Sequence, residues 1–398
     1  MWLMSRSELS INSDNRLAKL FWILLTLAVI VLSGLVLSHS GVNYREQQNL
    51  ALAKSNFAGL LHRQLSSDDP MPLYYLLIHG LAKIHFSSLA DMRELSLFAV
   101  ILAGFGGYFV GYRATEDKRV GLLGGLLIGL SPFMVWFGNR AAVYTLLALL
   151  TLINLYFYIG LLKRKNWSWP GYIMSSLVAL GFHFFFITVL LSETVFYFLN
   201  YRRFRKRDLY IMGASLATYI AGLAAWIAVS NHQTGIWQHL PFTSRPSATN
   251  IFIIFTQFLF GFQSVLITTI IMSLWPLLVI VGLLAVQKYV KPPPAIRYFA
   301  LLSFGIVLFM FAYSWIFRPL FLASYLIVCL PPFMLLISWY LIAFDLKSLS
   351  FFRYVLLFGM LVLLTLELSN PKKAIQQDYL GAPVSTVAVG NRIQPDGS

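Results

Sequence analysis

Long hydrophobic runs separated by short polar breaks occupy most of this chain, a pattern typical of a membrane protein. On a ~20-residue criterion for a bilayer span, we expect about eleven transmembrane helices. Their predicted ranges are 18–38, 95–112, 120–137, 142–161, 170–182, 184–200, 209–229, 264–287, 297–317, 320–343 and 354–368. The pattern therefore predicts an all-α polytopic membrane protein.

The largest interruption of this pattern is the segment 39–94, between the first two predicted spans. Near its start, apolar residues recur at a spacing that places them on one face of a helix: Leu50, Ala53, Phe57, Leu60 and Leu61. The stretch from Pro72 to Phe86 is also apolar, but a helix of about 15 residues spans only ~22 Å, less than a ~30 Å hydrocarbon core. We expect a large loop that carries two amphipathic helices, which lie at the interface or pack on other helices.

Composition supports a membrane protein and bounds its chemistry. Hydrophobic residues make up 58% of the chain and charged residues 11%, whereas soluble domains carry about 25% charged residues. The single cysteine among 398 residues excludes a disulfide framework and a thiolate metal site. We interpret Cys329, which lies in an apolar run, as a small core residue.

The net charge of +15 is explained by topology and not by nucleic acid, because most Lys and Arg fall in alternate loops. The positive-inside rule then places the N-terminus in the cytoplasm of an inner or plasma membrane, and the 39–94 loop on the outer side. The run 17–37 is too long for a signal peptide and is expected to be a retained helix. Residues 1–370 are expected to form one membrane domain, followed by a short polar outer tail at 371–398.

Three motifs on the predicted outer side belong together. The first is the segment 68–79, Asp-Asp-Pro-Met-Pro-Leu-Tyr-Tyr-Leu-Leu-Ile-His; the second is Ser131-Pro-Phe followed by the segment 139–144; the third is Arg318-Pro to Tyr325 followed by Pro331-Pro332. In order and placement they resemble the GT-C class of integral membrane glycosyltransferases, in the branch of protein mannosyltransferases and lipid A aminoarabinose transferases. The resemblance covers residues 20–345 and implies a GT-C-like fold.

The chain departs from the family pattern at a polar position of each motif region. Where the family has Asp-Glu early in the first outer loop, this chain has Arg45-Glu46. Where the family often has Glu-Ala-Arg-x-Tyr, this chain has Arg140-Ala-Ala-Val-Tyr144. Where the family tends to have Arg-Tyr in its late outer helix, this chain has Ser324-Tyr325.

The resemblance implies a polyprenyl-phosphate sugar as donor and transfer at the outer face. A carboxylate would act as general base, for which Glu46 is the first candidate and Asp68 the second. Positive charge, or a divalent cation as the alternative, would stabilise the departing lipid phosphate; no metal ligands are assigned. The candidate substrate-binding residues are Arg45, Asp69, Tyr74, Tyr75, His79, Asn139, Arg140, Tyr144, Arg318 and Tyr325.

Several alternatives stay open. Glu46 and Asp68 could instead form loop ion pairs with Arg45, Arg63 or Arg93. Two further functions compete with catalysis: a degenerate relative that binds lipid-linked sugar or assists a partner enzyme, and a lipid-linked sugar transporter. The expected partners are the lipid donor and membrane lipid, and the sequence does not give the sugar, the acceptor or the oligomeric state.

Two titratable residues, one inside a predicted span and one between two predicted spans, also need interpretation. Glu193, a carboxylate inside a predicted span, is either functional, or it is protonated or bonded to a neighbouring helix. His183 is interpreted as a packing residue.

Overall fold

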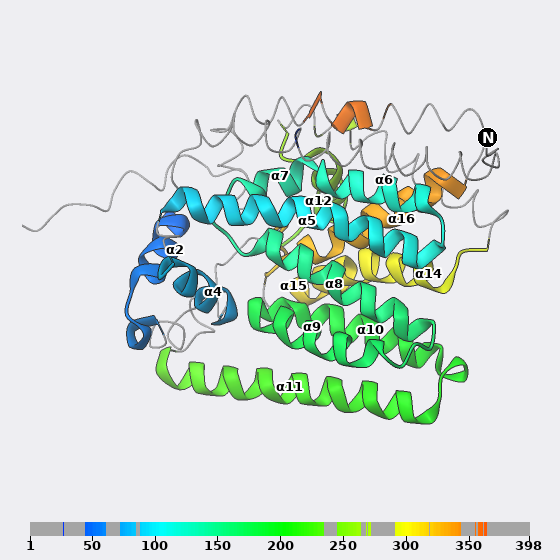
Figure 1. Ribbon diagram of the computed structural model, residues 1–398, viewed down its shortest axis with the longest axis horizontal. Helices are drawn as coiled ribbons and strands as arrows, with labels where there is room; N and C mark the ends of the chain where they lie inside the picture. The colour runs from blue at the N-terminus through cyan, green and yellow to red at the C-terminus, as the bar shows by residue number, and fades with distance from the viewer. Residues whose placement is uncertain are drawn as a thin grey trace, which may run out of the picture.

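The computed structural model describes residues 27, 44–60, 72–84, 88–234, 245–263, 268, 270–271, 291–317, 319–343, 355, 357–360 and 362–363. These residues form helices and no strand. Most of the helices lie side by side in one bundle, with α2 and α4 grouped at one end of it (Figure 1).

The α-helices of the bundle and its end have the following bounds. They are α2 (Tyr44–Lys54), α4 (Pro72–Ala82), α5 (Leu89–Thr115), α6 (Lys118–Gly129), α7 (Pro132–Gly138), α8 (Tyr144–Leu162), α9 (Ser168–Phe182), α10 (Ile187–Leu199), α11 (Lys206–Thr234), α12 (Ala248–Phe260), α14 (Pro294–Ala300), α15 (Ile306–Ile316) and α16 (Leu330–Ala343). A π turn, η4 (Leu301–Gly305), joins α14 to α15, and 3₁₀ turns η1 (Phe184–Phe186) and η5 (Tyr325–Cys329) precede α10 and α16.

Within the described residues, 5 helical segments are long and apolar enough to cross a membrane, or up to 6 if a bent pair counts as one span. The segments are Leu89–Thr115, Tyr144–Leu162, Lys206–Ala225, Pro294–Ile316 and Tyr325–Ala343, and each confirms a predicted span. The predicted spans 18–38 and 264–287 lie outside the described residues apart from a few positions, and only about half of the predicted span 354–368 is described. The prediction of eleven spans is therefore confirmed only for part of the chain.

The predicted span 120–137 corresponds to the bent pair α6 and α7, which meet at an angle of 51° and together are long and apolar enough to form one broken span. The break lies at Leu130 and Ser131. Pro132 is favoured at the start of a new helix, where its missing N–H costs nothing. The Ser131 hydroxyl accepts a weak hydrogen bond from the N–H of Met134 at 3.4 Å, which caps α7.

The first amphipathic helix of the loop is also interrupted. Helix α2 ends at Lys54, and the Asn56 side chain accepts a hydrogen bond at 2.7 Å from the N–H of Gly59, which starts a new turn. Phe57 is 59% exposed and so departs from the apolar face predicted for 50–61. Helix α4 begins at Pro72 as predicted, but ends at Ala82 and not at Phe86.

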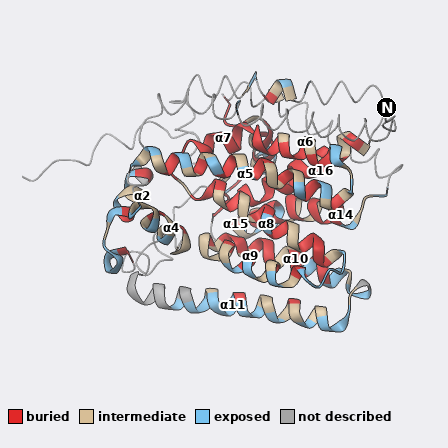
Figure 2. Cartoon of the chain, in the orientation of Figure 1, coloured by how far each residue is buried: buried red, intermediate tan, exposed pale blue. Residues whose placement is uncertain are grey.

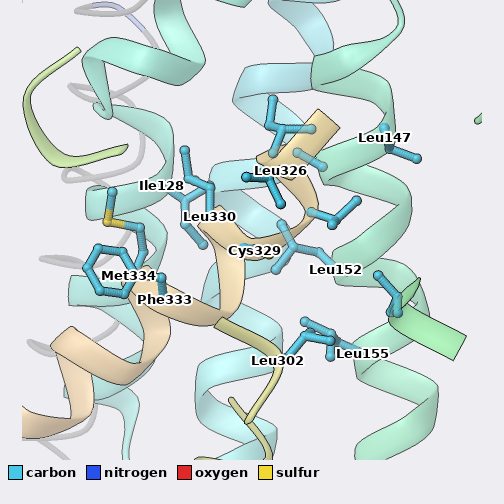
Figure 3. Packing of buried hydrophobic residues seen from close by; sticks show 14 of the residues in the cluster. Ile128, Leu147, Leu152, Leu155, Leu302, Leu326, Cys329, Leu330, Phe333 and Met334 are labelled. Carbon is cyan, nitrogen blue, oxygen red and sulfur yellow. The ribbon is translucent and has the colours of Figure 1, made fainter. Parts of the chain in front are cut away.

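Small residues let α5, α6 and α16 approach closely. A Cβ atom at Gly111 of α5 would lie 3.0 Å from the Cα atom of Gly121 in α6 and 3.1 Å from Leu335 in α16. The glycines of α5 therefore form a close-packing face against its neighbours. The buried residues concentrate in this part of the bundle (Figure 2), and Cys329 lies among the buried side chains as predicted (Figure 3).

Replacing Gly121 with alanine is expected to destabilise the bundle. The new Cβ atom would lie 2.6 Å from the backbone oxygen of Tyr108, and backbone cannot move aside as a side chain can. Overpacking of this kind costs ~1–3 kcal/mol. Thermal unfolding of the purified protein in detergent should show a lower midpoint. Gly222→Ala in α11 is the matched control, because no atom of the described residues lies within 4 Å of its Cβ position; equal midpoints for the two variants would contradict the prediction.

Candidate functional site

The carboxylate of Glu46, in the first turn of α2, is buried against Arg93 of α5. Arg93 donates hydrogen bonds from Nε to Oε1 at 2.9 Å and from Nη2 to Oε2 at 2.8 Å. Both side chains are almost fully buried, with 3% and 6% of their surface exposed. The pairing with Arg93 that the sequence left open is therefore formed, between residues 47 positions apart in the chain.

The same face of α2 holds the turn between α7 and α8. The N–H of Ala141 donates to Oε1 of Glu46 at 2.9 Å, and the Asn49 side-chain amide donates to the carbonyl oxygen of Ala141 at 2.8 Å. The hydroxyl of Ser96 in α5 donates to the carbonyl oxygen of Ala142 at 3.3 Å. Two neighbouring helices thus fix the backbone beside Arg140.

Arg140 is buried in this turn, with Nη1 3.9 Å from Oε2 of Glu46, an ionic contact longer than a hydrogen bond. Its guanidinium carbon lies 4.6 Å from the ring centre of Trp136, a cation–π contact. Nη1 has no hydrogen-bond partner among the described residues, and neither do the Trp136 indole N–H nor the Thr145 hydroxyl. Donors that are buried without acceptors are costly, and a group of them favours an anion as ligand.

Sequence reasoning named Arg140 but missed Trp136 and Thr145. Both flank the motif residues 139–144, so their proximity in the chain was the available signal. Asn139 donates to the carbonyl oxygen of Val135 at 2.9 Å, while its side-chain oxygen is buried with no partner among the described residues.

Tyr74 of α4 reaches the same region. Burial raises the pKa of its phenol well above the usual value, and nearby Tyr75, Glu46 and Tyr144 add to the increase. Its hydroxyl therefore keeps its proton at neutral pH and can donate a hydrogen bond. This places three sequence-predicted residues, Glu46, Tyr74 and Tyr144, in one neighbourhood.

A row of rings continues from Tyr144 toward η5. The centres of the Tyr144 and His183 rings are 6.3 Å apart, and those of the His183 and Tyr325 rings are 5.2 Å apart, with an angle of 61° between the latter two ring planes. The N–H of Phe185 donates to Nδ1 of His183 at 3.2 Å, which fits the packing interpretation of that histidine. Tyr325, from the third motif, thereby joins the second motif in space.

Tyr75 and His79 hold α4 against α2. The Tyr75 hydroxyl donates to Oδ1 of Asn49 at 3.0 Å, and Nδ1 of His79 lies 3.0 Å from the carbonyl oxygen of Ala53. The remaining candidates cannot be placed: Asp68, Asp69 and Arg318 lie outside the described residues, and Arg45 belongs to α2 but its side chain is not described.

The described part of the site does not fit a divalent cation. It offers one carboxylate, Glu46, and both oxygens of that carboxylate accept hydrogen bonds from Arg93 or Ala141. A guanidinium beside it adds positive charge, and hard cations require several free oxygen ligands. No group of three or more His, Cys, Asp or Glu side chains gathers anywhere in the described residues.

Glu193 lies apart from this site, fully buried in α10. The hydroxyls of Tyr172 in α9 and Tyr298 in α14 approach its carboxyl group but fall short of hydrogen-bond geometry. The Tyr158 hydroxyl donates to the backbone oxygen of Glu193 at 2.7 Å. Neither carboxyl oxygen has a hydrogen-bond partner among the described residues, so a bond from this carboxyl group to a neighbouring helix stays a prediction.

No protein-family model matches the chain, and no curated protein matches its sequence. Solved structures of ArnT from Cupriavidus metallidurans, an aminoarabinose transferase of the GT-C class, do match its fold. For ArnT bound to undecaprenyl phosphate the TM-score is 0.58 at 14% identity, over 88% of this chain and 64% of that chain. For ArnT in the apo state the TM-score is 0.57 at 13% identity, over 90% and 66%.

The chain thus spans about two thirds of the length of the ArnT structures that it matches. Identity this low establishes a shared fold and nothing about activity. The fold class expected from the sequence motifs is confirmed: the chain is an integral membrane protein with the GT-C-like fold of ArnT.

Proposed function

We propose that this protein binds a polyprenyl-phosphate sugar and transfers its sugar to an acceptor at the outer face of the membrane. The observation that carries the proposal is the buried Arg140 guanidinium over the Trp136 ring: neither its Nη1 nor the Trp136 indole N–H has a hydrogen-bond partner among the described residues. Planar guanidinium groups suit phosphate oxygens. One ArnT structure with this fold was solved with undecaprenyl phosphate bound, which supports the same class of lipid here.

The outer face is proposed from the distribution of charge. The site lies at the end of the bundle that carries α2 and α4 (Figure 1), which the positive-inside rule assigns to the outer side. Lys163, Arg164 and Lys165 follow α8, whose first residue Tyr144 lies at the site. These basic residues therefore fall at the opposite end of α8, on the predicted cytoplasmic side.

In this proposal the departing phosphate is stabilised by the Arg140 guanidinium and by N–H and O–H donors around it. The acceptor hydroxyl loses its proton to a carboxylate as it attacks the anomeric carbon. The sequence offers Glu46 and Asp68 for that role. The hydrogen bonds that Glu46 already accepts from Arg93 and Ala141 favour Asp68.

The same contacts support a second candidate function, a relative that binds lipid-linked sugar without transferring it. A carboxylate held by an arginine is a poor proton acceptor, because the positive charge lowers its basicity. Arg45 stands where the family has its proposed base. The two functions share the phosphate site and differ in whether a glycosyl product forms.

The test is product formation by the purified protein in lipid, with radiolabelled polyprenyl-phosphate sugars and an envelope extract as acceptor. Wild type would be compared with Asp68→Asn and Glu46→Gln. We expect label transfer by wild type and its loss in Asp68→Asn. Saturable donor binding without transfer by any protein would favour the binding function, and absence of both would overturn the proposal.

A further inference from the structure

Asn49 stands out because its side chain connects three separate parts of the site. Its amide nitrogen donates to the carbonyl oxygen of Ala141 at 2.8 Å, and its Oδ1 accepts from the Tyr75 hydroxyl at 3.0 Å. A carbonyl can only accept and the tyrosine hydroxyl donates here, so these two partners fix the orientation of the amide. Helix α4, helix α2 and the turn after α7 are thereby joined through one residue.

Glu46 binds the other polar backbone group of Ala141. It accepts from the N–H of Ala141 at 2.9 Å, so α2 binds both polar backbone groups of Ala141. Glu46 and Asn49 are three positions apart and share one face of a helix. Side chains on one rigid helix face therefore determine the path of the backbone immediately after Arg140.

We infer that Asn49 is a positioning residue, which with Glu46 orients the Arg140 guanidinium toward the phosphate of the lipid ligand. This inference rests on the proposed function. The guanidinium makes a 3.9 Å ionic contact with Glu46 and packs on Trp136. A guanidinium donates two parallel hydrogen bonds to a phosphate only when its plane is aligned with the phosphate oxygens. The alignment of Arg140 depends in turn on the backbone that Asn49 and Glu46 hold.

A substitution of Asn49 tests positioning without changing the charge of the site, whereas a substitution of Glu46 changes both. Removing the Glu46 carboxylate changes the electrostatic attraction for an anion as well as the geometry. Removing the neutral amide of Asn49 changes only the geometry. Asn49→Ala is therefore the informative variant, and Asn56→Ala in the same loop is its matched control, because Asn56 is exposed and its side chain bonds only to nearby Gly59 among the described residues.

The experiment is a double-mutant cycle with Arg140→Lys, in which the dissociation constant for undecaprenyl phosphate is measured for protein in nanodiscs. Lysine keeps the charge but has no fork to align. Asn49→Ala should weaken binding about tenfold in the wild-type background, and less than about twofold in the Arg140→Lys background. Asn56→Ala should bind like wild type.

The outcomes separate this inference from the proposed function. Unchanged affinity in Asn49→Ala, or an equal loss in both backgrounds, would overturn the positioning role while the phosphate site stands. An equal loss would mean that Asn49 supports the loop and not Arg140. If wild type shows no saturable binding of undecaprenyl phosphate, the proposed function is overturned and the positioning role with it.

Discussion

Replacing Glu46 with glutamine should lower the free energy of unfolding by about 3–5 kcal/mol, the cost typical of breaking a buried ion pair from one side. The variant leaves Arg93 buried without its carboxylate and leaves Arg140 without its ionic contact at 3.9 Å. Glutamine can still accept from the N–H of Ala141, so the loss arises mainly from uncompensated charge. Thermal or denaturant unfolding of the detergent-purified protein would measure it.

Two further variants test this explanation. Glu116→Gln removes an exposed ion pair with Lys163, in which the lysine hydrogen bond holds the Glu116 pKa below its usual range. That variant should unfold like wild type, because exposed pairs contribute little. Adding Arg93→Met to Glu46→Gln should recover part of the lost stability, since it removes the stranded charge.

The stability result also bears on catalysis. A carboxylate that serves as a general base is often held at some cost to stability, so that its removal is neutral or stabilising. A large loss of stability in Glu46→Gln would instead identify Glu46 as a structural partner of Arg93. Wild-type stability in that variant would contradict the ion-pair explanation and return Glu46 to the first place among the candidate bases.

Local signals in the sequence were sufficient for much of the fold. Long apolar runs predicted the helices that begin at Leu89 and Tyr144, and Pro72 marked the start of α4. Each of these features depends on neighbours within one turn or on the period of a single helix.

Other features depended on contacts that no local pattern encodes. Arg93 pairs with Glu46 because α2 packs against α5. The sequence alone offers no reason to prefer Arg93 over Arg45 or Arg63 as the partner. The bend between α6 and α7 lies within one continuous apolar run. Its signal, Ser131 followed by Pro132, was present in the sequence but outweighed there by hydropathy.

The candidate site was predicted as a set of motifs but not as a geometry. Order along the chain placed Arg140, Tyr144 and Tyr325 at the same end of the bundle, and the imidazole ring of His183 lies near the rings of both tyrosines. The role of Asn49 could not be predicted, because it depends on the backbone of a residue 92 positions away. Asp68 and Asp69 stay sequence-based predictions.

Replacing Arg140 with glutamine should weaken the binding of undecaprenyl phosphate by about 10- to 150-fold. A hydrogen bond to a charged group contributes about 1.5–3 kcal/mol, which corresponds to that range in the dissociation constant. Stability should not fall, since the variant removes a buried cation whose ionic contact with Glu46 is longer than a hydrogen bond. Binding titrations and thermal unfolding on the same nanodisc preparations would measure both quantities.

Arg245→Gln is the matched control for this variant. Arg245 also places its guanidinium over a tryptophan, with 5.5 Å between its carbon and the ring centre of Trp315, but its side chain is exposed. If any arginine on an aromatic ring sufficed, both variants would lose affinity. Loss in Arg140→Gln alone would assign phosphate binding to the buried donors around Trp136, and unchanged affinity in Arg140→Gln would place the phosphate elsewhere in the fold.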